Sequence, residues 1–198
     1  MWKYFFTVSM IVRYIAVLFV YVWGAIEIFR QIRQSRQKQG QTNADRGSLR
    51  LIYAAIFIGY GIGIPFAFFT FGRITWGEPY PAIFGLAVIA AGVSIRFIAM
   101  RTLSRHFTYA VSIQEQHELI EQGLYRFIRH PAYLGELVIF LGIGLAFANW
   151  ISLVVLCVCP FIAFHIRMNI EEKVLLDHFA ARYVEYQKRT WRLIPRLY

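Results

Sequence analysis

The chain has 198 residues, of which 58% are hydrophobic and 18% aromatic, and its formal net charge is +10. Only 16% of the residues are charged, against about 25% in a typical soluble domain. With a mean hydropathy of +0.49, this composition predicts a polytopic membrane protein. A basic excess also occurs in nucleic-acid-binding proteins, but the sequence has no zinc-finger spacing and no aromatic RNA-binding signature, so no nucleic-acid partner is expected.

Apolar runs that match a hydrocarbon core of about 30 Å follow one another along the chain. The first is predicted to be a span rather than a signal peptide, because Arg13 interrupts it and no small-residue cleavage site follows. The sequence therefore predicts an all-α polytopic membrane protein with about five transmembrane helices. The predicted spans are residues 5–28, 51–71, 81–98, 133–147 and 150–166.

The second predicted span contains a Gly-x-Gly-x-Gly run at Gly59, Gly61 and Gly63. No strand precedes this run and no charged residue is near it, so it predicts close helix packing rather than a nucleotide-binding loop. Pro65 follows in the same span and predicts a kink.

The last two predicted spans are short and are separated only by Ala148-Asn149-Trp150. We interpret residues 133–166 as a helical hairpin with a partly buried turn. Pro131 suits the first turn of a helix, so the helix of the fourth span is predicted to begin there with His130 at its mouth. The free N–H groups of that helix end would face an anion beside His130.

The C-terminal region alternates charged residues with apolar ones at helical spacing, over about residues 169–190. This pattern predicts an amphipathic helix on the cytoplasmic side, lying against the hairpin or the membrane surface. Residues 193–195, Leu-Ile-Pro, are expected to tuck against the protein.

The distribution of positive charge predicts the orientation in the membrane. Residues 30–50 carry many arginines, whereas the connection after the second span has only Arg73, set against Glu78. The basic segment is therefore expected in the cytoplasm, with the N-terminus outside and the C-terminus inside. We divide the chain into residues 1–100, which hold three spans and the basic loop, and residues 101–198, which hold the hairpin and the C-terminal helix.

Two polar clusters flank the hairpin, and a tight hairpin would bring both to the same cytoplasmic edge. Ordinary structural roles stay open: Arg129 and His130 could be snorkelling at the membrane edge, and Arg167 and Glu171 could be a surface salt bridge. Glu136 either pairs with an arginine, becomes neutral or takes part in chemistry, because an unpaired carboxylate inside a span is costly. The clusters are Tyr125, Arg129, His130, Tyr133 and Glu136 on entry, and His165, Arg167, Glu171 and Glu172 on exit.

Neither the histidines nor the cysteines predict a metal site. The sequence offers no convincing pair of histidines across two spans, and Cys157 and Cys159 lack the further ligands that zinc requires. We interpret both cysteines as small packing residues.

Two motifs in order, HELIEQGLYRFIRHPAYLGE at residues 117–136 and RMNIEEKVLLDHFAARYVEYQKRTWRLIP at residues 167–195, flank the hairpin. This arrangement resembles the isoprenylcysteine carboxyl methyltransferase family in its prokaryotic form, and the wider group that includes phospholipid N-methyltransferases. The resemblance implies an integral-membrane enzyme that takes a methyl group from S-adenosylmethionine. Such an enzyme lacks the nucleotide-binding fold of soluble methyltransferases.

The resemblance also implies roles for residues of both motifs. The adenosine end of the cofactor would lie against Leu119, Ile120, Gly123 and Tyr125, and its amino-acid end against His130, Pro131, Tyr133 and Gly135. Glu171 and Glu172 would bind cofactor hydroxyls or its cation, and Arg167 would face the acceptor. The candidate catalytic residues are thus Arg167, Glu171 and Glu136, with Glu136 or Glu172 as the base if the acceptor is an amine.

The favoured reaction is O-methylation of an isoprenylcysteine-type carboxylate on a lipid-modified substrate that enters from the bilayer. A phospholipid amine, a phenolic or quinone lipid and a small thiol stay open as acceptors. A membrane reductase similar to sterol reductases, or a non-enzymatic carrier, are the alternatives from other classes.

Overall fold

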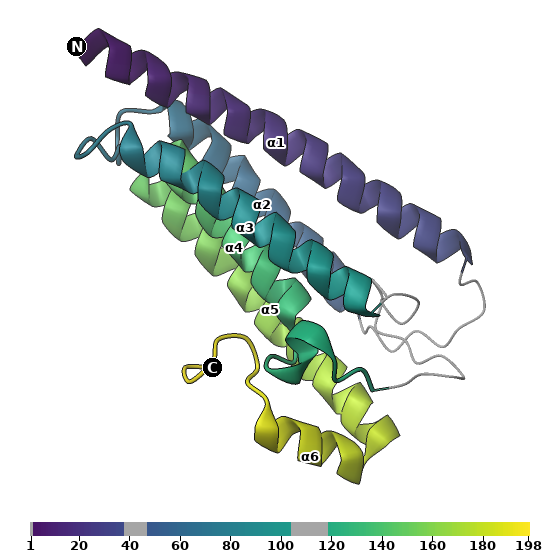
Figure 1. The fold of residues 1–198 in the computed structure, drawn as a ribbon. Helices are drawn as coiled ribbons and strands as arrows, with labels where there is room; N and C mark the ends of the chain where they lie inside the picture. The colour runs from purple at the N-terminus through teal and green to yellow at the C-terminus, as the bar shows by residue number, and fades with distance from the viewer. Residues whose placement is uncertain (1, 38–46, 104–118) are drawn as a thin grey trace.

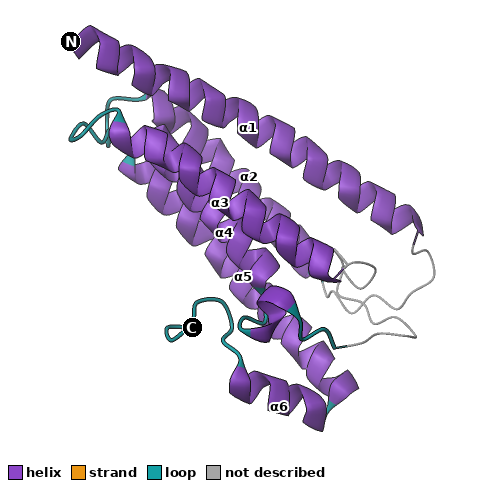
Figure 2. Cartoon of the chain, in the orientation of Figure 1, coloured by secondary structure: helices purple, strands orange, loops and turns teal. Residues whose placement is uncertain are grey.

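The computed structural model describes residues 2–37, 47–103 and 119–198 (Figure 1). Within these ranges the regular structure consists of helices joined by loops and turns (Figure 2). The helices are α1 (Trp2–Gln37), α2 (Ser48–Phe68), α3 (Tyr80–Leu103), the 3₁₀ turn η2 (Gly123–Arg126), α4 (Pro131–Phe147), α5 (Trp150–Phe179) and α6 (Ala181–Arg189).

Four of these helices are long and apolar enough to cross a membrane, and α4 is a shorter apolar helix. The spans lie within α1, α2, α3 and α5, at Thr7–Gln34, Ser48–Phe68, Tyr80–Leu103 and Trp150–Phe179. The prediction of an all-helical membrane protein is confirmed at this level. The 17 residues of α4 rise about 26 Å, which is short of the hydrocarbon thickness.

Helix α1 is longer than the predicted first span. It has 36 residues and continues to Gln37, because the stretch after Ile28 is rich in arginine and glutamine, which favour helix. Much of the predicted basic loop at residues 30–50 is therefore helical, and residues 38–46 lie outside the described part of the chain. A helix of this length rises about 54 Å, so its basic end projects beyond a hydrocarbon core.

Helices α3 and α4 pack with their backbones in close contact. A Cβ atom added at Gly85 would lie 2.4 Å from the backbone N of Ala146, and one added at Gly142 would lie 2.6 Å from the backbone N of Ile89. Neither atom would fit. The small residues let the two helices approach in a way that larger side chains would prevent.

Helices α2 and α5 pack through two of the three glycines noted in the sequence. Cβ atoms at Gly59 and Gly63 would lie 3.6 and 3.1 Å from the side chain of Leu156, whereas one at Gly61 would meet nothing within 4 Å. Close helix packing is therefore confirmed for Gly59 and Gly63. Pro65 lies inside α2, which continues to Phe68.

The turn between α4 and α5 is buried more completely than expected. Ala148 has a φ of 48°, and Asn149 caps α5 by accepting hydrogen bonds from the N–H groups of Ile151 and Ser152. The Asn149 amide donates to the carbonyl of Phe71 at 2.8 Å. Ala148 and Asn149 are 0% and 1% exposed, so the turn is held against the connection between α2 and α3.

Helix α5 does not end where the fifth span was expected to end. It continues past Ile166 to Phe179, and only then does the chain turn at Ala180 into α6. The predicted C-terminal helix is thus divided between the last turns of α5 and α6, because Arg167 to Phe179 has no helix-breaking residue. Helix α6 buries Tyr183 and Tyr186.

The two ends of the helix bundle are different. The start of α1, the connection between α2 and α3 and the hairpin turn lie at one end, and the mouth of α4, α6 and the C-terminus lie at the other (Figure 1). Both sequence motifs that flank the hairpin are therefore at the second end.

Candidate functional site

The mouth of α4 is held by the C-terminal segment of the chain. His130 occupies the N-cap position of α4, without a side-chain capping hydrogen bond, and Pro131 is the first residue of the helix, as predicted. The backbone N–H of Arg129 donates to the carbonyl of Trp191 at 2.8 Å, and that of His130 donates to the carbonyl of Arg192 at 3.2 Å. These bonds fix the direction in which both side chains leave the backbone.

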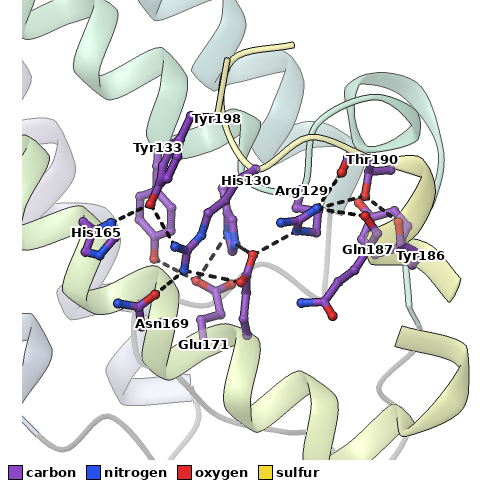
Figure 3. A network of polar contacts seen from close by, with 12 residues as sticks. Arg129, His130, Tyr133, His165, Asn169, Glu171, Tyr186, Gln187, Thr190 and Tyr198 are labelled. Atoms are coloured by element: carbon purple, nitrogen blue, oxygen red, sulfur yellow. Dashed lines mark hydrogen bonds and ion pairs between the residues drawn. The ribbon is translucent and has the colours of Figure 1, made fainter. Parts of the chain in front are cut away.

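Glu172 connects the two predicted clusters. Figure 3 shows the network of polar contacts around it, with His130, Tyr133 and Glu171 labelled. Its Oε1 lies 3.1 Å from His130 Nε2 and accepts a hydrogen bond from Arg129 Nε at 2.9 Å. Its Oε2 lies 3.3 Å from Arg192 Nη2. One carboxylate from α5 thus joins the mouth of α4 to the C-terminal segment.

A second chain of contacts runs through Tyr133. Arg167 Nε donates to the Tyr133 hydroxyl at 2.8 Å, and this hydroxyl donates to Glu171 Oε2 at 3.0 Å. Arg167 Nη1 donates to Ser48 Oγ, at the start of α2, at 2.8 Å. The site therefore draws on three helices that are far apart in sequence.

Of the charged groups described here, Glu171 is the most exposed. Its side chain is 33% exposed, against 3% for Arg167 and 14% for the side chain of Glu172. In the described part of the chain, Glu171 Oε1 has no hydrogen-bond partner, while Oε2 accepts from Tyr133. A carboxylate oxygen directed to an accessible position can accept from hydroxyl groups or an ammonium group.

The C-terminal residues close one side of the site. Arg192 donates to Asn169 Oδ1 at 2.6 Å and to the Tyr198 hydroxyl at 2.8 Å. The same hydroxyl lies 2.5 Å from His165 Nδ1. Of the expected apolar tuck at residues 193–195, only Leu193 is buried, at 1% exposure, whereas Ile194 is 45% exposed.

The sequence matches a known protein family. The sequence model of the phospholipid methyltransferase family matches residues 80–182, which is more than half of the chain. The chain belongs to the phospholipid methyltransferase family. The predicted resemblance to this group of membrane methyltransferases is confirmed.

The curated relatives of this family member are named for isoprenylcysteine. Protein-S-isoprenylcysteine O-methyltransferase B of Arabidopsis thaliana is 35% identical over 114 residues, 57% of this chain and 58% of that protein. The Saccharomyces cerevisiae protein-S-isoprenylcysteine O-methyltransferase is 33% identical over 57% of this chain and 48% of its own length. The chain thus spans about half the length of these relatives.

A solved structure has a similar fold. It is that of a eukaryotic intramembrane Ras methyltransferase, isoprenylcysteine carboxyl methyltransferase. The TM-score is 0.61 at 23% sequence identity, over 73% of this chain and 52% of the solved one. At this identity the likeness concerns the fold of the helical bundle.

Some of the predicted site residues of this chain lie beside the cluster of Glu171 and Glu172 rather than in it. Leu119 packs with Tyr183 and Tyr186 of α6, and Tyr125 packs with Ala99 and Ala132. The carbonyl of Tyr125 accepts a hydrogen bond from the Tyr186 hydroxyl at 2.7 Å. Residues 117–118 of the first motif lie outside the described residues.

Gly123 and Ile120 belong to the same segment as Leu119 and Tyr125. Gly123 has a φ of 57° and approaches Thr102 of α3, and Ile120 is half-buried. The segment therefore packs between α3 and α6, next to the N-terminal end of α4, and we call residues 119–125 the wall of the site.

Gly135 and Glu136 face α3 instead of α5. A Cβ at Gly135 would lie 2.6 Å from the backbone N of Arg96, and Glu136 Oε2 lies 2.9 Å from Arg96 Nε. The Trp23 indole donates to Glu136 Oε1 at 3.2 Å. Of the outcomes left open for Glu136, the structure shows pairing with an arginine.

Sequence reasoning missed several residues that complete these contacts. Arg96 could have been found, because an ionisable residue inside an apolar span is a candidate for function or pairing. Ser48 and Tyr198 gave no comparable signal, since single hydroxyl residues near helix ends or chain ends are common. The missed residues outside the family match are Trp23, Glu27, Ser48, Arg192 and Tyr198.

Proposed function

We propose that this chain is an integral-membrane methyltransferase that methylates the carboxylate of an isoprenylcysteine-type acceptor with S-adenosylmethionine. The observation that carries the proposal is the polar cluster of His130, Tyr133, Arg167, Glu171 and Glu172 at one end of an apolar bundle. The names of the curated relatives support the same substrate class.

The residues of the site fit the charges of this cofactor. S-adenosylmethionine carries a sulfonium, an ammonium and a carboxylate, and when bound it supplies an electrophilic methyl group. Glu171 offers an accessible carboxylate oxygen to hydroxyl or ammonium groups. His130 and the first turn of α4, a helix of 17 residues, offer N–H donors to a carboxylate.

We assign the other predicted residues to supporting roles. The wall formed by residues 119–125 would lie against the adenosine end, with Leu119, Ile120, Gly123 and Tyr125 as its contacts. Pro131 and Gly135 would set the position of α4, and Glu172 would hold His130 in orientation, since it already lies 3.1 Å from the imidazole. Tyr133 would orient Glu171.

Arg167 distinguishes the acceptor classes. It is a buried cation, 3% exposed, whose Nε is oriented by Tyr133 and whose Nη1 is oriented by Ser48. A guanidinium attracts and orients a carboxylate and repels an ammonium group. A carboxylate is already a nucleophile and needs no base, whereas an amine would first have to lose a proton. The electrostatics of the site therefore favour a carboxylate acceptor.

We further propose that α4 crosses the membrane as a fifth, internal helix. Its start is linked to the start of α2, since Tyr133 reaches Ser48 through Arg167, and the turn after it contacts the connection that follows α2, through Asn149 and Phe71. An odd number of crossings, with arginine-rich ends on the side of the site, puts the N-terminus outside and the site and α6 at the cytoplasmic surface. Labelling of single cysteines at the two chain ends in intact cells tests this orientation.

The cofactor is tested first by calorimetric titration of the detergent-purified protein with S-adenosylhomocysteine. We expect saturable binding that is lost or strongly weakened in His130→Ala and Glu171→Ala. Lys188→Ala is the matched control, because Lys188 is exposed on α6 and its ion pair is with the exposed Glu185. Absence of binding by folded wild-type protein would refute the proposed cofactor.

The acceptor is then tested with radiolabelled S-adenosylmethionine. N-acetyl-S-farnesylcysteine is expected to be methylated to a base-labile ester, and phosphatidylethanolamine is expected to stay unlabelled. Labelling of the phospholipid alone would replace the carboxylate by an amine as the acceptor.

A further inference from the structure

A second buried charged cluster lies between α1, α3 and α4, and it does not form part of the site described above. Arg96 of α3, which is 8% exposed, is its centre. Arg96 Nη2 lies 2.9 Å from Glu27 Oε2 of α1, and Arg96 Nε lies 2.9 Å from Glu136 Oε2 of α4. Trp23 of α1 donates to the second oxygen of Glu136.

Arg96 also contacts the backbone of α4 directly. Its Nη1 donates to the carbonyl of Ala132 at 3.1 Å. Ala132 is the second residue of α4, and it lies between Pro131 and Tyr133. One guanidinium group thus binds both the first turn of α4 and a side chain one turn further along the helix.

Close to Arg96, α4 cannot shift toward α3, because the two helices already pack backbone to backbone. The backbone of Arg96 would lie 2.6 Å from a Cβ at Gly135, so the two helices are in direct contact there. Losing one member of a buried ion pair leaves the other charge uncompensated in an apolar setting, which makes the arrangement costly to disturb.

We infer that Arg96 is a positioning residue that sets the place of His130 and Tyr133 by holding the first turn of α4 against α3 and α1. Glu136 acts in the same unit, as the side chain through which α4 is held, and Glu27 and Trp23 complete the unit from α1. The link to catalysis rests on the proposed function, because the cofactor would lie against His130.

Glu136 lies in this positioning unit rather than beside Glu171. In the described part of the chain its polar contacts are with Arg96 and Trp23. At 6% exposure, and packed between a guanidinium and an indole, this carboxylate is poorly placed to accept a proton from a substrate. The predicted role of Glu136 as a catalytic base is thus replaced by a role in positioning.

The substitution that tests the inference is Arg96→Lys. A lysine keeps the charge but cannot bridge Glu27, Glu136 and the Ala132 carbonyl with one planar group. Arg101→Lys is the matched control, because Arg101 lies on the same helix, is exposed, and stacks over Phe97.

The first readout does not depend on a cofactor. In ¹⁵N-histidine-labelled protein, the imidazole signals of His130 are assigned by their absence in His130→Ala. We expect these signals to shift in Arg96→Lys and to coincide with wild type in Arg101→Lys. A variant that only melts at a lower temperature, with unchanged His130 signals below that temperature, would overturn the inference.

The second readout is the affinity for S-adenosylhomocysteine, expected to weaken about 3- to 30-fold in Arg96→Lys and to stay unchanged in Arg101→Lys. Equal affinity of wild type and Arg96→Lys would also contradict the inference. If folded wild type does not bind the ligand, the proposed function fails, and the His130 signals still decide whether Arg96 positions the mouth of α4.

Discussion

The two ends of the bundle both bury charged side chains, but they do so differently. At the end with the hairpin turn, Arg13 and Arg73 converge on Glu78, at 3.0 and 2.9 Å, and Ser9 donates to the same carboxylate. At the other end, Arg129, His130 and Arg192 converge on Glu172, while the neighbouring carboxylate of Glu171 is a third exposed.

The difference shows why burial of charge is not by itself a sign of a binding site. The Glu78 cluster, defined as Ser9, Arg13, Arg73 and Glu78, ties α1 to the connection between α2 and α3. The site cluster has the same kinds of ion pair plus an accessible carboxylate at the mouth of a helix. We therefore expect the first cluster to govern stability and the second to govern ligand binding.

The largest expected effect is on stability, at the Glu78 cluster. Glu78→Gln removes the countercharge of Arg13, which is 2% exposed, and of Arg73. Breaking a buried pair costs about 3–5 kcal/mol, so the thermal midpoint in detergent should fall by many degrees. Titration well below that midpoint should give wild-type affinity for S-adenosylhomocysteine, and a loss of affinity would contradict the division between the two clusters.

The next effect is on activity. Arg167→Lys keeps the charge but cannot contact Tyr133 and Ser48 together, so the orientation of the acceptor proposed for Arg167 would be lost. We expect kcat/KM for the farnesylated acceptor to fall roughly 100-fold, which is the loss expected when a reacting group is misplaced by about 1 Å. Affinity for S-adenosylhomocysteine should change far less. An equal loss in kcat/KM and in affinity for S-adenosylhomocysteine would mean that Arg167 contacts the cofactor instead of the acceptor.

A smaller effect is expected at the hairpin turn. Asn149→Ala removes the cap of α5 and the hydrogen bond to Phe71. Loss of such a cap costs about 1 kcal/mol. Thermal unfolding monitored by circular dichroism should show a modest decrease, and methyl transfer per folded molecule should be unchanged. The decrease in thermal midpoint should be much smaller than that of Glu78→Gln measured in parallel.

The smallest effect is expected on the surface of α6. Lys188 and Glu185 are exposed and lie 3.3 Å apart. Exposed pairs of this kind contribute about 0–1 kcal/mol, so Lys188→Ala should leave both stability and ligand affinity near wild type. A marked loss of affinity would mean that the binding region extends onto the outer face of α6.

Several features of the fold could be predicted because they depend on local chemistry. Pro131 has no N–H to lose at the start of a helix, and the structure begins α4 there. The two residues Ala148 and Asn149 leave room only for a tight reversal, and the hairpin is found. Long apolar runs need little context to be recognised, since the hydrocarbon core dictates their length.

Other features could not be read from the sequence because they depend on which helices become neighbours. The fifth span was predicted at residues 150–166 with a separate helix after it, whereas α5 continues without a break to Phe179, where the chain leaves it for α6. Glu136 was grouped with the site because it is close to His130 in sequence. Only the packing of α3 on α4 gives it Arg96 as its partner.

By itself, the sequence of this protein determined an apolar helical bundle, the hairpin, and the residue types of the site, since helix formation and membrane insertion follow from local composition. The tertiary structure alone decided the partners of these residues. Arg167 donates to Ser48, and Arg192 pairs with Glu172. Glu136 pairs with Arg96, away from the site. Such contacts join segments that are distant in sequence, so they depend on how those segments pack. Between α2 and α5, for example, this packing is permitted by Gly59 and Gly63.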